Sequence, residues 1–240
     1  MRLLEIIYKC TIPLSYMEDN GKPSHIGTGV LIATEQNCYL LSATHVFEDD
    51  QKVINKATIE NVVYCKDDNV YPINGRFAYY LDKENPDILI CKLADETIEE
   101  LSHFFNFLPS YLILQGSKLR QTYDYYIVGY PIGKVKWTFP YDKSFKRSRY
   151  VIQLPGLEED YFNFHVEFHI NKLTNIETGL RICAPNIKGM SGCGLWYKFK
   201  DNIYLVGIIH YFNNTESKIS ATKIDFAVDI LNREFNDSYE

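Results

Sequence analysis

Short segments rich in β-branched and aromatic residues recur along the chain of 240 residues, and turn-forming residues separate them. Such residues favour strands, and strands at this spacing favour a protein built from sheets. The segment 162–170 alternates most cleanly, with Phe164 and Val166 on one face and Asn163 and His165 on the other. The sequence therefore predicts an all-β fold. The strands that we expect are 3–9, 26–33, 37–44, 58–65, 87–93, 125–130, 148–154, 162–170, 193–199 and 203–211.

Helical signals are found in two segments. Segment 95–106 begins with acidic residues, which suit the start of a helix, and it places Ile98, Leu101 and Phe105 on one apolar stripe. The second predicted helix is short and C-terminal, from about Phe226 to Phe235. Because the first helix lies near the middle of the chain, we expect two β-domains that together form one unit, residues 1–110 and residues 111–240.

Composition and charge argue against several classes of function. No apolar run approaches the ~20 residues that a membrane span needs, so we expect no membrane partner. Acidic residues outnumber basic ones, 31 to 25, and the net charge of −6 disfavours nucleic acid as a partner, because binding it requires neutralised phosphates. Glu5 interrupts the apolar start of the chain and no small-residue cleavage site follows, so we expect no secretory signal.

The cysteines do not form the pairs that zinc or redox motifs use, because no two of them are spaced as C-x-x-C. Several lie in apolar runs, where reduced cysteines act as small core residues, and this favours a cytoplasmic, reducing location. The even number of cysteines leaves disulfides open as an alternative. Metal binding by one strand face of His165, Glu167 and His169 is the weaker interpretation beside a polar outer face, so we expect no metal and no cofactor. The six cysteines are Cys10, Cys38, Cys65, Cys91, Cys183 and Cys193.

One serine lies between glycines in the segment Gly189-Met190-Ser191-Gly192, just ahead of an apolar strand. Glycine at such positions indicates a tight turn with a close approach of the backbone. A turn of this kind can aim the backbone N–H groups of Gly189 and Ser191 at one point beside the serine hydroxyl. Acyl transfer develops its negative charge at such a point, so the segment predicts a nucleophile with an oxyanion hole.

A serine nucleophile needs a base, and the base needs a carboxylate that fixes its tautomer. His45 follows the apolar segment Cys38-Tyr39-Leu40-Leu41, and Asp87 comes directly before another apolar segment. The order His, Asp, Ser along the chain is one of the known orders of such triads. The alternatives without a catalytic role are an ordinary histidine at a strand end, an aspartate in a turn and a serine in a turn. Asp82 is the nearest substitute for Asp87.

These segments resemble those of trypsin-like serine proteases with the chymotrypsin fold, and most closely the bacterial and HtrA-like branch. Ser42-Ala43-Thr44-His45 resembles T-A-A-H, Asp87-Ile88-Leu89-Ile90 resembles D-I-A-L, and Gly189-Met190-Ser191-Gly192 resembles G-[DN]-S-G. Three further segments resemble family strands: Gly27–Ile32, Tyr126–Pro131 and Val206–Ile209. The resemblance spans about residues 25 to 212, in the family's order. It implies two six-stranded antiparallel β-barrels, with His45 and Asp87 on the first and Ser191 on the second.

The chain departs from the pancreatic-type enzymes at Met190, where they carry the aspartate that pairs with a newly cut N-terminus. No segment resembles their I-V-G-G start, so activation by propeptide cleavage is not supported. We therefore keep an activating protein partner, or the ordering of a loop, as the hypothesis for regulation. Cys193 and Leu195 replace the family's usual glycine and proline.

The resemblance also implies which residues form the specificity pocket. Pro185, six positions before the serine, would lie at its base, and this uncharged residue disfavours cleavage after lysine or arginine. The walls would come from Ile209, His210, Tyr211 and Phe212. The two aromatic residues favour small or medium apolar side chains in the substrate, whereas His210 would instead suit an acidic one.

The sequence is compatible with two functions. The leading prediction is a serine endopeptidase that hydrolyses protein or peptide substrates through an acyl-enzyme, with Ser191 as nucleophile, His45 as base and Asp87 as its orienting carboxylate. The alternative is a pseudoprotease, or a latent binding or sensor module on the same fold that acts after a partner engages it. A nucleic-acid-binding barrel is disfavoured by the negative charge.

Overall fold

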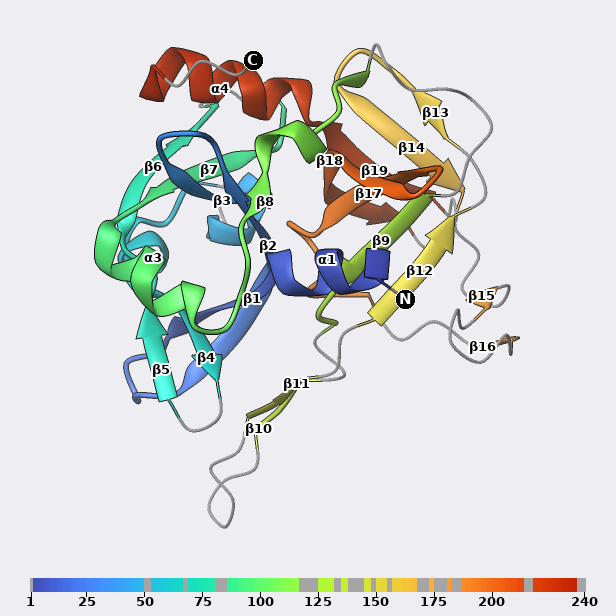
Figure 1. Cartoon of the computed structure of the whole chain (residues 1–240). Helices are drawn as coiled ribbons and strands as arrows, with labels where there is room; N and C mark the ends of the chain where they lie inside the picture. The colour runs from blue at the N-terminus through green and yellow to red at the C-terminus, as the bar shows by residue number, and fades with distance from the viewer. Residues whose placement is uncertain are drawn as a thin grey trace.

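The computed structural model describes most of the chain and shows a mostly β protein with two antiparallel sheets and a short C-terminal helix (Figure 1). The described residues are 2–49, 53–66, 69–80, 86–116, 125–131, 135–137, 145–147, 150–154, 157–167, 173–174, 181–182, 187–213 and 218–236.

The first sheet contains eight strands in the order β5-β4-β1-β2-β3-β7-β6, with β8 paired in parallel to β2. Its strands are β1 (Thr11–Met17), β2 (Pro23–Ala33), β3 (Cys38–Ser42), β4 (Val62–Lys66), β5 (Asn69–Pro72), β6 (Gly75–Tyr79), β7 (Leu89–Leu93) and β8 (Leu108–Pro109). The antiparallel pairing of β3 with β7 sets Ser42 opposite Leu89. Because the chain leaves β3 where it enters β7, the residues after Ser42 lie beside those before Leu89.

The second sheet contains seven strands in the order β12-β9-β17-β18-β19-β14-β13. Its strands are β9 (Tyr125–Gly129), β12 (Tyr150–Leu154), β13 (Glu158–Glu159), β14 (Asn163–Glu167), β17 (Gly194–Phe199), β18 (Asn202–Asn213) and β19 (Lys218–Lys223). Two separate strand pairs join β10 (Val135–Trp137) to β11 (Phe145–Arg147) and β15 (Leu173–Thr174) to β16 (Arg181–Ile182).

The helical elements of the described chain are α1 (Arg2–Cys10), η1 (Thr44–Phe47), α2 (Lys56–Glu60), α3 (Asp95–Ser102), η2 (Ser110–Leu112) and α4 (Asp225–Phe235). The predicted helices near 95–106 and 226–235 correspond to α3 and α4. None of the described helices has both the length and the apolar character that crossing a membrane requires.

The predicted strand 3–9 is wrong, because this segment is the helix α1. Its apolar residues suit either structure locally, but Ile7 and Cys10, three positions apart, are both buried, and Glu5 and Lys9 form an ion pair of 3.2 Å one turn apart. The predicted strand 58–65 begins too early. The side chain of Asn55 caps α2 by accepting hydrogen bonds from the N–H groups of Ala57 and Thr58, and the strand begins only at Val62.

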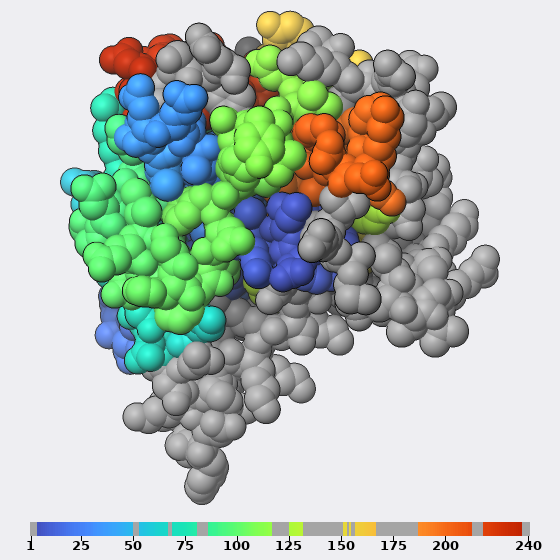
Figure 2. All heavy atoms as spheres, viewed as in Figure 1, coloured from blue at the N-terminus to red at the C-terminus, as the bar shows by residue number. Residues whose placement is uncertain are grey.

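Three large apolar cores support the two sheets, beside a small cluster of Val63 and Cys65. One core lies within each sheet, and the third contains buried residues from both sheets together with residues of α1 and α4, among them Ile7, Val30, Val128, Leu205 and Ile230. The segment after α3 runs along the outside, past α1 and on to β18 (Figures 1 and 2). Its Leu114 N–H donates to the carbonyl of Leu205 at 2.9 Å. The two sheets are therefore packed against each other around a shared core.

The predicted all-β fold is confirmed in a coarser form, as a mostly β protein, whereas the six strands expected for each barrel differ from the eight and seven observed in the two sheets. The extra strands are short ones at the sheet margins, such as β5, β8 and β13. The strand order of each sheet has two ends, so closure into barrels remains a prediction, as does the division into domains 1–110 and 111–240. Residues 148–149 and 168–170 of two predicted strands lie outside the described residues.

Candidate functional site

His45 lies in η1, the single helical turn that follows β3. Thr44, Val46 and Phe47 of this turn are buried and anchor it to the first sheet, whereas the side chain of His45 remains 35% exposed. Asp87 lies at the tip of a tight turn in which the N–H of Ile88 donates to the carbonyl of Pro86 at 3.0 Å. The pairing of β3 with β7 therefore brings a histidine and an aspartate together from two tight turns.

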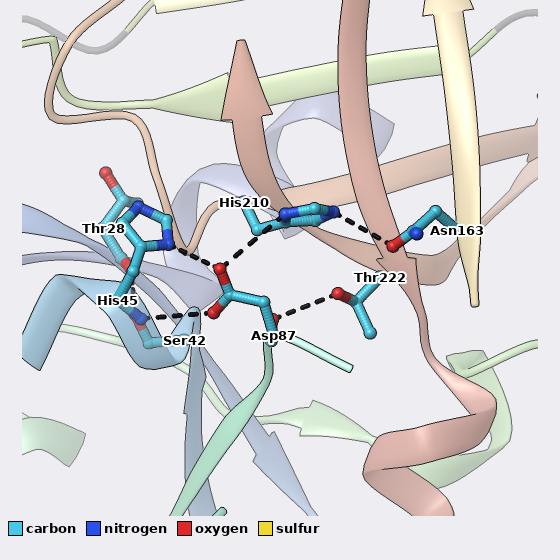
Figure 3. A network of polar contacts seen from close by, with 7 residues as sticks. All are labelled: Thr28, Ser42, His45, Asp87, Asn163, His210 and Thr222. Atoms are coloured by element: carbon cyan, nitrogen blue, oxygen red, sulfur yellow. Dashed lines mark hydrogen bonds and ion pairs between the residues drawn. The ribbon is translucent and has the colours of Figure 1, made fainter. Parts of the chain in front are cut away.

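Asp87 binds His45 through both of its carboxylate oxygens (Figure 3). The ring Nδ1 of His45 donates to Oδ2 at 2.7 Å, and the backbone N–H of His45 donates to Oδ1 at 3.2 Å. A carboxylate only accepts hydrogen bonds, so Nδ1 carries the proton and Nε2 of the neutral ring is left as the basic nitrogen. This arrangement fixes both the tautomer and the orientation of the imidazole.

The pair shifts the pKa of each partner. Burial acts to lower the pKa of His45, but the hydrogen bond and charge of Asp87, with the charge of Glu48, outweigh it and raise that pKa. Burial likewise acts to raise the pKa of Asp87, but the hydrogen bond and charge of His45, the charge of His210 and the backbone bond outweigh it and lower that pKa. His45 is thus a stronger base than an ordinary histidine, and the carboxylate beside it stays ionised.

Ser191 lies in the second of two consecutive tight turns that need glycine. The N–H of Met190 donates to the carbonyl of Ile187 at 2.9 Å, and the N–H of Cys193 donates to the carbonyl of Met190 at 3.0 Å. The third residue of each turn is a glycine with positive φ, +92° at Gly189 and +86° at Gly192. These bonds and angles are those of type II turns, in which other residues are strained at that position.

The turn around Ser191, which we call the serine turn, is held against the first sheet by hydrogen bonds from the backbone and side chain of Thr28. The N–H of Thr28 in β2 donates to the carbonyl of Ser191 at 2.8 Å, and the hydroxyl of Thr28 donates to the carbonyl of Gly189 at 3.0 Å. A Cβ on Gly192 would collide with the carbonyl of Thr28 and with the hydroxyl of Ser42. Ser191 is therefore placed next to the end of β3, from which His45 follows three residues later.

The groups that acyl transfer would use make no hydrogen bonds within the described part of the chain. The N–H groups of Gly189 and Ser191 have no acceptor among the described residues. The hydroxyl of Ser191 makes no hydrogen bond with any described residue, and His45 is one of these residues. Such contacts are often long before substrate binds. The site thus combines a hydrogen-bonded histidine and aspartate with a serine whose hydroxyl has no hydrogen-bond partner among the described residues.

Asp87 has two further partners on the second sheet. The hydroxyl of Thr222 in β19 donates to the backbone carbonyl of Asp87 at 3.1 Å, and the ring Nδ1 of His210 in β18 lies 3.7 Å from Oδ2 (Figure 3). The other ring nitrogen of His210, Nε2, lies 3.0 Å from Oδ1 of Asn163 in β14. Asp87 is therefore held between the two sheets rather than by the first sheet alone.

The predicted pocket residues differ in how far they are exposed and in what they contact. Ile209 is buried, Phe212 is half-buried and Tyr211 is 53% exposed, whereas His210 faces Asp87 and Asn163. Pro185 lies outside the described residues. The specificity pocket therefore remains a prediction.

Sequence patterns did not identify Thr28, Thr222 or Asn163 as parts of the site. Thr28 lies in the segment Gly27–Ile32, which resembles a family strand, but that resemblance gave it no role, and Thr222 lies in no motif. The alternation of 162–170 did place Asn163 and His165 together on a polar face. In the structure the residues of that face form hydrogen bonds. The ring of His165 is hydrogen-bonded to the hydroxyl of Ser220 at 2.9 Å and to the carboxylate of Asp160 at 2.8 Å.

Neither a metal site nor a disulfide is found in the described part of the chain. No group of three or more His, Cys, Asp or Glu side chains there is placed to hold a metal ion, and His169 lies outside it. The five described cysteines are free thiols: Cys10, Cys38, Cys65, Cys91 and Cys193.

No protein-family model and no curated protein matches this chain.

Proposed function

We propose that the chain is a serine endopeptidase in which Ser191, His45 and Asp87 act as nucleophile, base and orienting carboxylate. The observation that carries the proposal is the double hydrogen bond from His45 to Asp87, which leaves Nε2 as the basic nitrogen. The serine turn lies against the end of β3, three residues before His45, and this supports Ser191 as the nucleophile.

The proposed reaction has two halves. Oγ of Ser191 attacks the carbonyl carbon of the scissile peptide bond while Nε2 of His45 takes the hydroxyl proton. The same proton then passes to the leaving nitrogen, the carbon–nitrogen bond breaks, and an ester on Ser191 remains. Water attacks that ester, gives its proton to His45 and releases the carboxylic product, with the proton returned to Ser191. Asp87 stays ionised throughout and stabilises the imidazolium.

The free N–H groups of Gly189 and Ser191 support the oxyanion part of the proposal. Each is a fixed dipole beside the proposed nucleophile, and neither has an acceptor to give up among the described residues. One such donor contributes roughly 2.7–4 kcal/mol to transition-state stabilisation in acyl transfer. Glycine at position 189 suits this role because its positive φ allows the turn that exposes the N–H.

The substrate that we propose is a protein or peptide, with an uncharged or acidic residue rather than lysine or arginine before the cleaved bond. The proposed chemistry needs no cofactor. The free cysteines support a reducing, cytoplasmic location, because oxidising compartments favour disulfides.

One observation favours a second candidate, a latent or inactive module on the same scaffold. The hydroxyl of Ser191 makes no hydrogen bond with His45 in this structure. A protein partner that turned this hydroxyl toward Nε2 would activate the enzyme, whereas a chain that never makes the contact would act by binding alone.

A fluorophosphonate probe tests the proposal, because it reacts with a serine hydroxyl only where a base activates it. We expect one probe molecule per chain, located on Ser191 by peptide mass spectrometry, and no adduct in Ser191→Ala. The variant Ser102→Ala, which removes an exposed serine of α3, is the matched control and should label normally. A folded wild-type chain that takes up no probe on Ser191 would contradict the proposed endopeptidase and favour the latent or inactive module.

A further inference from the structure

Four aromatic side chains form a continuous strip at the start of α4, which contacts strands of both sheets (Figure 1). The strip begins with Tyr80, just after β6, whose ring centroid lies 6.4 Å from that of Phe226 in α4. The ring of Phe226 in turn lies 5.4 Å from Phe162 and 6.2 Å from Tyr161, in the turn between β13 and β14. We call these four residues the aromatic strip. It joins the edge of the first sheet to a turn of the second.

The aromatic strip ends in a strongly exposed ring. Tyr161 is 78% exposed, whereas Tyr80, Phe162 and Phe226 are half-buried. An exposed ring that continues a contiguous apolar surface is typical of an interaction site, and tyrosine is enriched in such sites.

The turn that carries Tyr161 is preorganised by Asp160. The carboxylate of Asp160 accepts hydrogen bonds from the N–H groups of Phe162 at 2.8 Å and Asn163 at 2.7 Å, and from Nε2 of His165 at 2.8 Å. Burial acts to raise the pKa of Asp160, but these bonds outweigh it and lower that pKa to about 2. The turn is therefore fixed and charged before any partner binds, which reduces the entropy that binding would cost.

The surface around the aromatic strip is acidic. Two cations beside it are in ion pairs, Lys223 with Glu159 at 2.8 Å and Arg233 with Asp229 at 3.3 Å. Carboxylates therefore outnumber cations here, and this surface attracts a cationic partner and repels an anionic one. The further carboxylates are those of Glu158, Asp160 and Asp225.

One end of the aromatic strip already binds a cation. The guanidinium of Arg233 lies 5.1 Å from the ring centroid of Tyr80 and donates to the carboxylate of Asp229 at 3.3 Å. The hydroxyl of Tyr80 donates to the same carboxylate at 2.8 Å. At the other end, Tyr161 also has carboxylates beside it, but no Lys or Arg side chain of the described residues lies over its ring. The strip thus has one tyrosine with an arginine in place and one that is exposed.

We propose that the aromatic strip is a docking surface for a protein partner, which binds through a segment that carries arginine beside apolar residues. The arginine lies over Tyr161, with its guanidinium toward the carboxylate of Glu158, as Arg233 lies over Tyr80. The apolar residues pack on Phe162. Arginine suits this place better than lysine, because its planar guanidinium both stacks on aromatic rings and pairs with carboxylates. Nucleic acid and anionic membranes are unsuited, because the surface is negative.

The docking surface lies beside the candidate site, on the side of Asp87. The residue before Tyr80 pairs with β7 only two positions after Asp87. The carbonyl of Asp87 accepts from Thr222, whose neighbour Lys223 donates its N–H to the carbonyl of Phe162 at 3.0 Å. A protein held at the aromatic strip can therefore bring a second segment to the candidate site. The inference goes beyond the proposed function and does not depend on it, because docking involves no reaction.

The experiment measures how a fluorescein-labelled peptide, Gly-Leu-Arg-Leu-Arg-Leu-Gly, binds the full chain with the substitution Ser191→Ala, which prevents cleavage. Fluorescence anisotropy gives the Kd at low and at high salt. We expect binding that weakens as salt rises, weaker binding when lysine replaces arginine in the peptide, and none when glutamate replaces it. Amide NMR shifts on addition of the arginine peptide should be largest in the aromatic strip and in the turn that carries Tyr161.

Variants of the chain identify the ring and the charge. Tyr161→Ala should weaken binding of the arginine peptide by about fivefold to tenfold, whereas Tyr161→Phe keeps the ring and should bind as before. The matched control is Tyr111→Ala, because Tyr111 in η2 is 75% exposed, and it should change nothing. Glu158→Lys should also weaken binding, and Glu35→Lys, in an exposed turn after β2, should have little effect.

Three results would overturn the proposal: an arginine peptide that does not bind the folded chain, equal losses in Tyr161→Ala and Tyr111→Ala, or tighter binding of the glutamate peptide. Self-association of the chain that Tyr161→Ala abolishes would also overturn it, because the partner would then be a second copy. Dispersed amide spectra show that each variant has folded. Binding in Ser191→Ala is independent of fluorophosphonate labelling in the wild type, so the docking surface and the proposed endopeptidase can each fail without the other.

Discussion

The two halves of the candidate site are held in different ways. On the first sheet, His45 and Asp87 are joined through the carboxylate of Asp87, which accepts hydrogen bonds of 2.7 and 3.2 Å from His45. On the second, the turn around Ser191 is held through its backbone carbonyls, by bonds from Thr28 of 3.0 Å to Gly189 and 2.8 Å to Ser191. The hydroxyl of Ser191 itself makes no bond among the described residues.

This difference separates what is preorganised from what is free to move. The charge pair of the first half is fixed in tautomer and direction before any substrate binds. In the second half the backbone is fixed, and one side-chain rotation of Ser191 remains. Changes to the first half should therefore act on charge and pH dependence, and changes to the second half should act on the position of the nucleophile.

The largest expected effect belongs to Asp87→Asn. The amide that replaces the carboxylate can donate to Nδ1 of His45 and so favour the wrong tautomer. We expect the rate of fluorophosphonate labelling at Ser191 to fall by about 10⁴-fold, while the fold is kept. Time courses of labelling measure this, with circular dichroism as the check on folding. A variant that labels within tenfold of the wild type would show that the charge pair is not part of the reaction.

The next effect, on stability, is expected at Gly192. Ala at this position meets both a positive φ and contacts with the carbonyl of Thr28 and the hydroxyl of Ser42, so the free energy of unfolding should fall by ~3 kcal/mol or more. The matched control is Gly21→Ala, because Gly21 also has a positive φ, +75°, with no neighbouring atom within 4 Å. It should cost only about 1–2 kcal/mol. Equal losses in urea unfolding would mean that the docking contact of the serine turn contributes nothing.

A smaller effect is expected for Thr28→Val, which should act on the second half alone. Its hydroxyl donates to the carbonyl of Gly189 and accepts from the N–H of Tyr130 at 3.2 Å, so the variant removes two buried hydrogen bonds. We expect a loss of about 1–3 kcal/mol in the free energy of unfolding and slower labelling of Ser191, with the pKa of His45 unchanged. Thr28→Ser keeps the hydroxyl and should retain the labelling rate. A shift in the pKa of His45 would argue that the two halves are not independent.

The smallest effect is the dependence of stability on pH. The raised pKa of His45 contributes stability below the ordinary histidine value of about 6.5, and this is lost as pH rises through the raised pKa. The lowered pKa of Asp87 contributes stability above the ordinary carboxyl value of about 3.9, and this is lost as pH falls through the lowered pKa. The stability difference between wild type and Asp87→Asn should therefore be largest between about pH 4 and 6.5. Urea unfolding at several pH values measures it, and a flat difference would contradict the pairing.

The sequence predicted those parts of the molecule that depend on local pattern. The alternation of 162–170 corresponds to β14, in which Phe164 and Val166 are buried. The segment 3–9 could not be assigned in the same way, because its apolar residues suit a strand or a helix. Packing against the core that the two sheets share favours the helix. That His45 and Asp87 would meet was expected from the family resemblance, whereas the bond itself comes from the register of β3 with β7.

The contacts of His210 could not be predicted, because they depend on an irregularity in strand pairing. One extra residue in β18 turns its ring toward Asp87, and its other partner, Asn163, is 47 residues away in the chain. The bonds of Thr28 to the serine turn are long-range in the same sense. Single-residue shifts between strands leave no signal in local composition, so they become visible only when the sheets are assembled.

The central claim is that His45 activates Ser191, and the pH dependence of labelling tests it most directly. The rate of fluorophosphonate attachment to Ser191 is measured across pH in the wild type, and the pKa of His45 is measured separately by NMR in the same buffer. We predict that the rate rises along the titration curve of His45, with a midpoint above the ordinary histidine pKa of about 6.5. A rate that does not follow that curve, or an adduct on another residue, would contradict the account.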